Sequence, residues 1–178
     1  MIYMRVPRDR LGALIGKDGC TKALIEEETK CVLEIDSDSG DVAIIEGDDP
    51  EGVLKAKDVV AAIAHGFSPE RAALLFRSRY YLQMLEMRDY VKKDPKHMRR
   101  VRGRIIGTRG KTRALIEQLS GAEVSVSAHT IGIIGDILSL EIAREAVEML
   151  LKGSEHATVY RYLERRRREI KAAEIEMA

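Results

Sequence analysis

The sequence has 178 residues, 45% of them apolar and 33% charged, with a formal net charge of +1. No apolar run reaches the roughly 18 residues of a membrane span, and the first ten residues lack the apolar core of a signal peptide, so a soluble cytoplasmic protein is expected. The two cysteines and four histidines have no ligand spacing, so we expect no metal or other cofactor.

The first half of the chain predicts the order β-α-α-β-β-α. Pro7 ends a β-rich opening segment, and SDSG separates two aliphatic, largely β-branched runs as a hairpin turn does. In the second helix we expect Thr21, Ala23 and Leu24 to face inward. The expected elements are a strand at 1–6, helices at 8–15 and 20–29 around a turn at 16–19, strands at 32–36 and 42–46, and a helix at about 50–65.

The second half predicts the same order. A connector helix begins at Ser68-Pro69-Glu70, and a last helix carries the apolar stripe Val159, Leu163, Ile170 and Ala173. We therefore divide the chain into a first domain at 1–67, a connector at 68–80, a second domain at 81–153 and a basic C-terminal helix at 154–178. The expected elements are a connector helix to about Arg79, a strand near 81–90, a helix ending at Ile106, a glycine turn, a helix to Leu119, strands at 123–127 and 130–134, and helices at 138–152 and from 154 onward.

The two halves are an internal duplication. Residues 12–36 and 103–127 align without a gap at an offset of 91, with nine identities in 25 positions. The shared residues centre on two glycines three apart, between two short helices. An isolated pair of this kind is usually a helix C-terminal glycine and nothing more. Two copies in matching context favour a functional loop.

The glycine loops suit a phosphate backbone. Glycines let a polyanionic chain approach closely, and the helix that follows offers free N–H groups and a positive dipole. The competing P-loop interpretation fails, because GxxxxGK[ST] ending at Gly110-Lys111-Thr112 needs a glycine where the chain has Ile105. No carboxylate pair, catalytic triad order or metal cluster indicates an enzyme.

The arrangement of these motifs resembles a type I KH domain. Ile15-Gly16 and Ile106-Gly107 each open an IGxxG loop that is followed by LIE and an aliphatic strand. The resemblance implies an α+β fold of two tandem KH domains (β-α-α-β-β-α), with single-stranded RNA clamped at the loops and its bases in an aliphatic groove. Low aromatic content agrees and disfavours an RRM. The residues expected to bind RNA are Gly107, Thr108, Arg109 and Gly110, the cations Arg104, Lys111 and Arg113, the groove residues Ile105, Ile106 and Leu115, and, in the first unit, Gly16, Lys17, Asp18, Gly19 and Lys22.

Charge is segregated along the chain despite the small net value. Eight Lys or Arg and no carboxylate lie between Pro95 and Ile116, whereas the middle of the first half, up to Glu51, is acidic. Local potential decides where a polyanion binds. We therefore expect the second unit to be the main RNA reader, and the first to be a weaker clamp or a protein-binding surface.

The tandem spacing, the stretch RIIGTRGKTRALIE and the basic last helix resemble the archaeal relatives of the ribosome-assembly factor Dim-two, or partner of Nob-one, and the related Krr-one proteins. That resemblance implies a non-enzymatic factor of the small ribosomal subunit that binds near the 3′ end of its rRNA. It also implies a translation initiation factor and an rRNA-processing endonuclease as partners. Arg165, Arg166, Arg167 and Arg168 are a secondary RNA-binding candidate, with a solvated helix face as the alternative.

Two other functions stay open from the sequence. The acidic hairpin of the first half suits a scaffold that docks to an initiation factor or nuclease without RNA. A KH protein of another RNA pathway, such as the exosome, would carry the same loops, although an exosome subunit is expected to have a β-rich domain ahead of them. The sequence does not identify the bases read, the use of both loops at once, or the oligomeric state.

Overall fold

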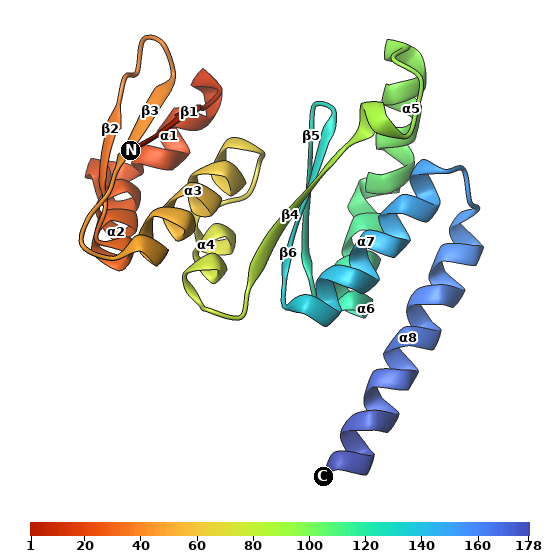
Figure 1. Cartoon of the computed structure of the whole chain (residues 1–178). Helices are drawn as coiled ribbons and strands as arrows, with labels where there is room; N and C mark the ends of the chain where they lie inside the picture. The colour runs from red at the N-terminus through yellow and green to blue at the C-terminus, as the bar shows by residue number, and fades with distance from the viewer. The chain divides into compact units, whose positions relative to one another are not determined.

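The computed structural model describes residues 1–178, which form two compact units, Met1–Leu82 and Gln83–Ala178 (Figure 1). Both repeat the predicted order of elements, and each contains a three-stranded antiparallel sheet with its third strand in the centre. None of the helices is long and apolar enough to span a membrane. The duplication seen in the sequence is therefore a duplication of the fold.

The first unit follows the sequence pattern closely. Its hairpin pairs Val32 with Ile45, and its outer strand pairs Ile2 with Ile44. Alternate residues of the central strand, Val42 and Ile44, are fully buried, as the period of a strand requires when one face meets the core. Its elements are β1 (Ile2–Arg5), α1 (Arg8–Ile15), the 3₁₀ turn η1 (Lys17–Gly19), α2 (Cys20–Thr29), β2 (Val32–Ile35), β3 (Asp41–Ile45), α3 (Pro50–Ala64), α4 (Pro69–Ala72) and η2 (Ala73–Phe76).

The second unit encloses its own apolar core. Its central strand is buried along its whole length, and Ile131 and Ile133 have no exposed surface. Asp94 and Asp136 each cap a helix by accepting a backbone N–H. Its elements are β4 (Tyr81–Glu86), η3 (Met87–Asp89), α5 (Pro95–Ile106), η4 (Thr108–Gly110), α6 (Lys111–Ser120), β5 (Glu123–Ser127), β6 (Thr130–Gly135), α7 (Ile137–Leu151) and α8 (His156–Met177).

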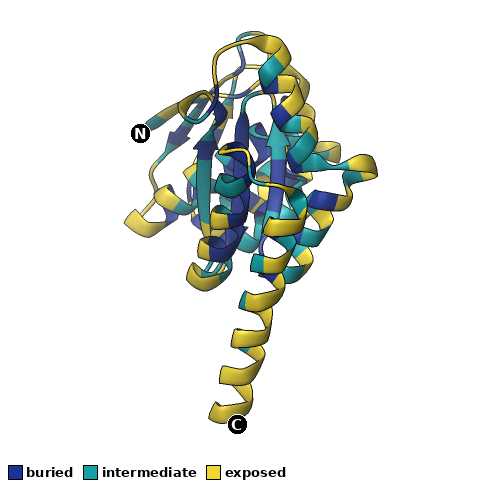
Figure 2. Cartoon of the chain, turned by 90° about the vertical axis from the view of Figure 1, so that its right-hand side faces the viewer, coloured by how far each residue is buried: buried dark blue, intermediate teal, exposed yellow.

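The last helix belongs to the second unit for about its first half. Val159 and Leu163 are fully buried in that unit's core, and Ile170 is half-buried. Every residue from 171 onward is exposed, including Ala173, which we had placed on the apolar stripe (Figure 2). The stripe is thus real up to Ile170 and ends there.

Two further expectations about local structure are wrong. Ala23 and Leu24 face outward, because α2 buries the row Thr21, Ile25 and Thr29, spaced four residues apart on one helix face. The strand expected near 81–90 ends at Glu86, whose side chain accepts the Arg88 amide and starts η3.

The connector is shorter as a helix than expected. It breaks into the four-residue α4 and the 3₁₀ turn η2, and it ends at Phe76 instead of Arg79. Its apolar residues Ala72 and Leu75 are buried, so it packs within the first unit.

Candidate nucleic-acid interface

The two glycine loops have the same backbone shape. Gly16 has φ 75° and ψ 172°, and Gly107 has φ 76° and ψ 172°. The second glycines, Gly19 and Gly110, are both left-handed with ψ 14°. Between them Asp18 and Arg109, which are not glycines, also take the left-handed conformation, at φ 54° and 57°. Such residues are uncommon outside strained or functional turns.

The first glycine of each loop is required by packing. A Cβ on Gly107 would lie 2.3 Å from Thr112 Oγ1, and one on Gly16 would lie 2.4 Å from Thr21 Oγ1. Both threonines are buried on the first turn of the following helix. The first glycine of each loop therefore allows close packing of the loop against the following helix. The expectation that it leaves room for a ligand backbone is wrong for this residue.

The second glycine of each loop is open. A Cβ on Gly19 would meet nothing within 4 Å, and one on Gly110 would only reach the end of the Arg113 side chain at 4.0 Å. These residues immediately precede α2 and α6. The Gly19 and Gly110 amides donate to the Gly16 and Gly107 carbonyls at 3.2 Å, and the Cys20 and Lys111 amides donate to carbonyls of the same loops. The second glycine therefore leaves space beside the positive end of the following helix, where an anion is favoured.

Side chains around the second loop present charge and some apolar surface. Thr108, Arg109 and Lys111 are exposed, whereas Ile106 and Leu115 are half-buried near the loop. In the first loop Lys17 and Asp18 are exposed, so its charges offset each other. The two loops thus share a shape and differ in charge.

Ile105 does not line a groove. Its side chain has no exposed surface and packs in the core of the second unit. The adjacent Ile106 is the one that reaches the surface beside the loop.

The Arg104 side chain is engaged in hydrogen bonds within the protein. Its guanidinium donates to the carbonyls of Leu150 and Ser154, where α7 ends and the chain turns toward α8. The Arg104 carbonyl in turn accepts a hydrogen bond from His156 Nε2 at 2.8 Å. Its charge is thus directed at helix-end carbonyls, and the role we predicted for it at phosphate is weakened.

Arg113 is also engaged. Its guanidinium lies 3.5 Å from the Glu117 carboxylate and 3.3 Å from the Val124 carbonyl, while Glu117 accepts the Val124 amide at 2.9 Å. In the first unit Glu26 accepts the Leu33 amide at 2.8 Å and pairs with Lys22 at 4.0 Å. The repeated glutamate therefore satisfies an amide on the outer strand of each sheet.

A support behind the second loop was missed in the sequence. The Tyr160 hydroxyl of α8 lies 2.9 Å from Thr112 Oγ1, the group against which Gly107 packs. His156 holds the end of α5 on the other side of the loop. The sequence of α8 does not indicate which distant groups its polar side chains will contact, so these contacts could not be predicted from it.

The arginine run of α8 is divided among several neighbours. Arg167 donates to the Gln118 carbonyl of α6 at 3.2 Å, whereas Arg165 and Arg166 both pair with Glu169. Arg165 also lies over the Tyr162 ring. Arg165 and Arg168 border a cavity between α7 and α8, whereas Arg166 and Arg167 do not line it. The four side chains do not converge on one site.

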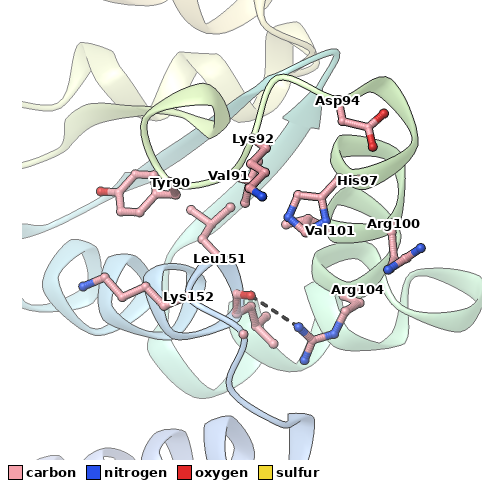
Figure 3. A pocket seen from close by; sticks show the side chains of 12 residues that line it. Tyr90, Val91, Lys92, Asp94, His97, Arg100, Val101, Arg104, Leu151 and Lys152 are labelled. Carbon is pink, nitrogen blue, oxygen red and sulfur yellow. Dashed lines mark hydrogen bonds between the residues drawn. The ribbon is translucent and has the colours of Figure 1, made fainter.

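Two cavities border α5. One of about 390 Å³ lies toward the turn between β5 and β6 and is lined by Arg99, Arg102 and His129 among others. The other, of about 580 Å³, lies between α5 and the end of α7 and is shown in Figure 3. The cations of α5 are thus divided between two faces of the helix.

The acidic hairpin of the first unit uses part of its charge internally. Asp36 accepts the amides of Asp38 and Ser39, and these hydrogen bonds, the first above all, lower the pKa of its carboxyl from the ordinary 3.8. The Arg8 guanidinium donates to the Asp38 carbonyl, and Arg5 lies 3.9 Å from Asp41. By contrast, the exposed carboxylates of Glu27 and Glu28 on α2 and of Glu34 on β2 make no internal hydrogen bond or ion pair of this kind.

Comparison with known proteins agrees with this geometry. The KH domain model matches residues 1–62, and a model of the eukaryotic-type KH domain, type I, matches residues 81–168. A KH domain-containing protein of Methanocaldococcus jannaschii is 47% identical over 177 residues, which cover 98% of this chain and 77% of that protein. Pre-rRNA-processing protein pno1 of Schizosaccharomyces pombe is 34% identical over 113 residues, 63% of this chain and 47% of that protein.

A solved structure is similar over nearly the whole chain. It is the complex of a/eIF2α, aDim2p and rRNA from Pyrococcus horikoshii, in which a chain 47% identical superposes with a TM-score of 0.87 and covers 94% of both chains. The chain spans about half the length of the fungal pre-rRNA-processing relative. The extent of the archaeal matches confirms two tandem type I KH units, and the chain belongs to the KH-domain family, among its Dim2/Pno1-like proteins.

Proposed function

We propose that this protein is a cytoplasmic, non-enzymatic RNA-binding factor of small ribosomal subunit maturation. Its ligand is single-stranded rRNA near the 3′ end, and its partners include a translation initiation factor and the processing endonuclease. Support comes from the pre-rRNA-processing relative and from the P. horikoshii relative, whose structure contains rRNA and a/eIF2α. No group of three or more His, Cys, Asp or Glu side chains is placed to hold a metal ion.

The observation that carries the proposal is the second loop. Its left-handed turn exposes Thr108 and Arg109, and Gly110 opens directly onto the start of α6 with space around its Cα. A phosphodiester can lie beside Gly110, at the positive end of α6, while Arg109 and Lys111 neutralise it. Ile106 and Leu115 give the adjoining base an aliphatic surface.

The first loop offers the same shape with less charge. Asp18 occupies the left-handed position that Arg109 holds in the second loop. A carboxylate there repels phosphate, so Gly16, Lys17, Gly19 and Lys22 form a weaker clamp.

A double substitution tests the site. Thr108→Asp with Arg109→Asp places two carboxylates at the phosphate, and binding to small-subunit 3′ RNA should fall at least about tenfold, equivalent to about 1.4 kcal/mol. Lys17→Asp is the matched control, because it gives the first loop the same Asp-Asp pair. It should reduce binding much less. Unchanged filter binding by the second-loop variant would show that the site is elsewhere.

A second function is favoured by one observation. Glu27, Glu28 and Glu34 are exposed and unpaired on the first unit, which suits a basic protein partner. Glu27→Lys with Glu28→Lys should then weaken binding to the initiation factor or nuclease without changing RNA affinity. Salt titration separates the two modes, because RNA affinity should fall steeply between about 50 and 200 mM salt.

A further inference from the structure

The cations around α5 are mostly unpaired. After the capping Asp94, this helix carries no carboxylate, and Arg100 and its neighbour in space Lys92 are both exposed. The Lys152 side chain, at the end of α7, is exposed as well. The cationic residues of the second unit that make ion pairs are Arg88, Arg113, His129, Arg144, Arg165 and Arg166, and these three cations are not among them.

These three cations border a single cavity of about 580 Å³. Val101 and Leu151 lie against it as apolar surface, and His97 projects among the side chains that line it (Figure 3). The volume lies within the usual range for a site that holds a small organic group.

The other charged groups at the cavity are already engaged. The Asp94 carboxylate accepts the Lys96 amide at 3.1 Å, and in Figure 3 it points away from the other side chains. Arg104 is directed at the carbonyls of Leu150 and Ser154, which cancels the negative end of α7. Lys92, Arg100 and Lys152 therefore outnumber the single carboxylate at the cavity, and Val101 and Leu151 supply apolar surface.

We propose that this cavity binds one nucleotide of the RNA strand, outside the segment held at the second glycine loop. The phosphate lies between Lys92 and Arg100, and the base lies on Val101 and Leu151. The proposal rests on RNA being the ligand of the second loop. Its location follows from α5, which runs from this cavity through Arg104 to Gly107 and so joins the two sites along one rigid helix.

An RNA strand fits better than an acidic peptide. A carboxylate-rich segment would match the cations and leave the apolar surface and the flat His97 ring unused. A nucleotide uses both, since it combines one negative group with a flat, largely apolar base that stacks on such surfaces.

Full-length protein with two lengths of small-subunit 3′ RNA tests the proposal by fluorescence anisotropy. An oligonucleotide of about six residues fills the loop, and one of about twelve also reaches the cavity. Lys92→Glu with Arg100→Glu should lower the affinity for the longer RNA at least tenfold. It should also reduce the slope of log affinity against log salt concentration by about 1.4, because two phosphate contacts on a single strand are lost. The shorter RNA should bind within about twofold of wild type, because it does not reach Lys92. Lys55→Glu with Lys57→Glu, on α3 of the first unit, is the charge-matched control.

The outcomes separate the two proposals. If wild type does not bind the shorter RNA, the loop is not the clamp and the proposed function fails. If wild type binds both lengths and the double reversal changes neither, or changes both equally, the cavity is not a nucleotide site. A competitor peptide of glutamates that binds at the cavity in place of RNA would also overturn it. Removal of bases from the added nucleotides should cost affinity in wild type, which a purely ionic surface would not show.

Discussion

Alanine at Gly107 should damage the fold far more than alanine at Gly110. At Gly107 the new Cβ would lie 2.3 Å from Thr112 Oγ1 and 2.6 Å from the Thr112 backbone nitrogen, so rotation of the threonine cannot relieve the clash. The backbone there, at φ 76° and ψ 172°, is a region used almost only by glycine. Alanine costs about 1–3 kcal/mol for that conformation, and overpacking adds about 1–3. Together these terms predict a loss of about 2–6 kcal/mol.

At Gly110 the same change meets open space. The residue is left-handed with ψ 14°, and alanine there costs about 1–2 kcal/mol. Gly103→Ala is the control, because Gly103 lies inside α5 with nothing near its Cα, so alanine should stabilise by about 0.8–1.0 kcal/mol. Gly16→Ala should reproduce the large loss in the first unit, where the Cβ would lie 2.4 Å from Thr21 Oγ1.

Urea unfolding followed by far-UV circular dichroism measures these differences, with each unit allowed its own transition. RNA binding by the folded Gly110→Ala protein then reports on the open glycine alone. Equal losses at Gly107 and Gly110 would refute the division of the loop into a packing glycine and a ligand-facing glycine.

Three further predictions follow from the contacts around the loops. Tyr160→Phe leaves the buried Thr112 hydroxyl without its partner in α8 and should cost about 1–3 kcal/mol in urea unfolding; no change would mean that the bond is absent in solution. Arg104→Gln should lower stability by about 1–3 kcal/mol and have little effect on the salt dependence of RNA binding. Lys111→Gln should leave stability unchanged and lower the slope of log affinity against log salt concentration by about 0.7. The reverse pattern would show that Arg104 binds phosphate. The pKa of Asp36 is lowered because the turn hydrogen-bonds its ionised carboxylate, so this stabilisation is present above the ordinary 3.8 and is lost as pH falls through the lower folded pKa. An NMR titration midpoint at or above 3.8 would contradict this. Asp36→Asn should remove this part of the acid dependence of stability.

Most of the fold could be predicted because the chain repeats itself. The aligned segments 12–36 and 103–127 share turn glycines and strand patterns, so a weak signal in one copy was confirmed by the other. The glycine loops were located correctly for the same reason.

The direction of side chains was harder to predict. Ala23 and Leu24 are apolar and yet exposed, while the buried face of α2 includes Thr29, whose hydroxyl bonds the Ile25 carbonyl. Ser120 does the same with Ile116 in α6. Small hydroxyl residues that satisfy themselves in this way can be buried at little cost, and hydrophobicity alone does not identify them.

The role of a charged residue could not be predicted where its partner is a backbone carbonyl far away in the sequence. Arg104 was assigned to phosphate because it belongs to a basic stretch, but its partners Leu150 and Ser154 come from a helix end more than 40 residues later. Ile105 and Ile106 were both placed in a groove from their position beside the loop, but consecutive residues of a helix face different directions, so only Ile106 reaches the surface.

The attachment of α8 determines where the protein tolerates cleavage. Trimming within residues 171–178 removes only solvated turns and should pass unnoticed by the rest of the molecule. A cut just after Gly153, at the apparent end of the KH repeat, would instead remove His156 and Tyr160. It would also remove the buried Val159 and Leu163 and so expose part of the core to water. The smallest fragment that keeps a native second loop therefore extends well past the repeat that defines it.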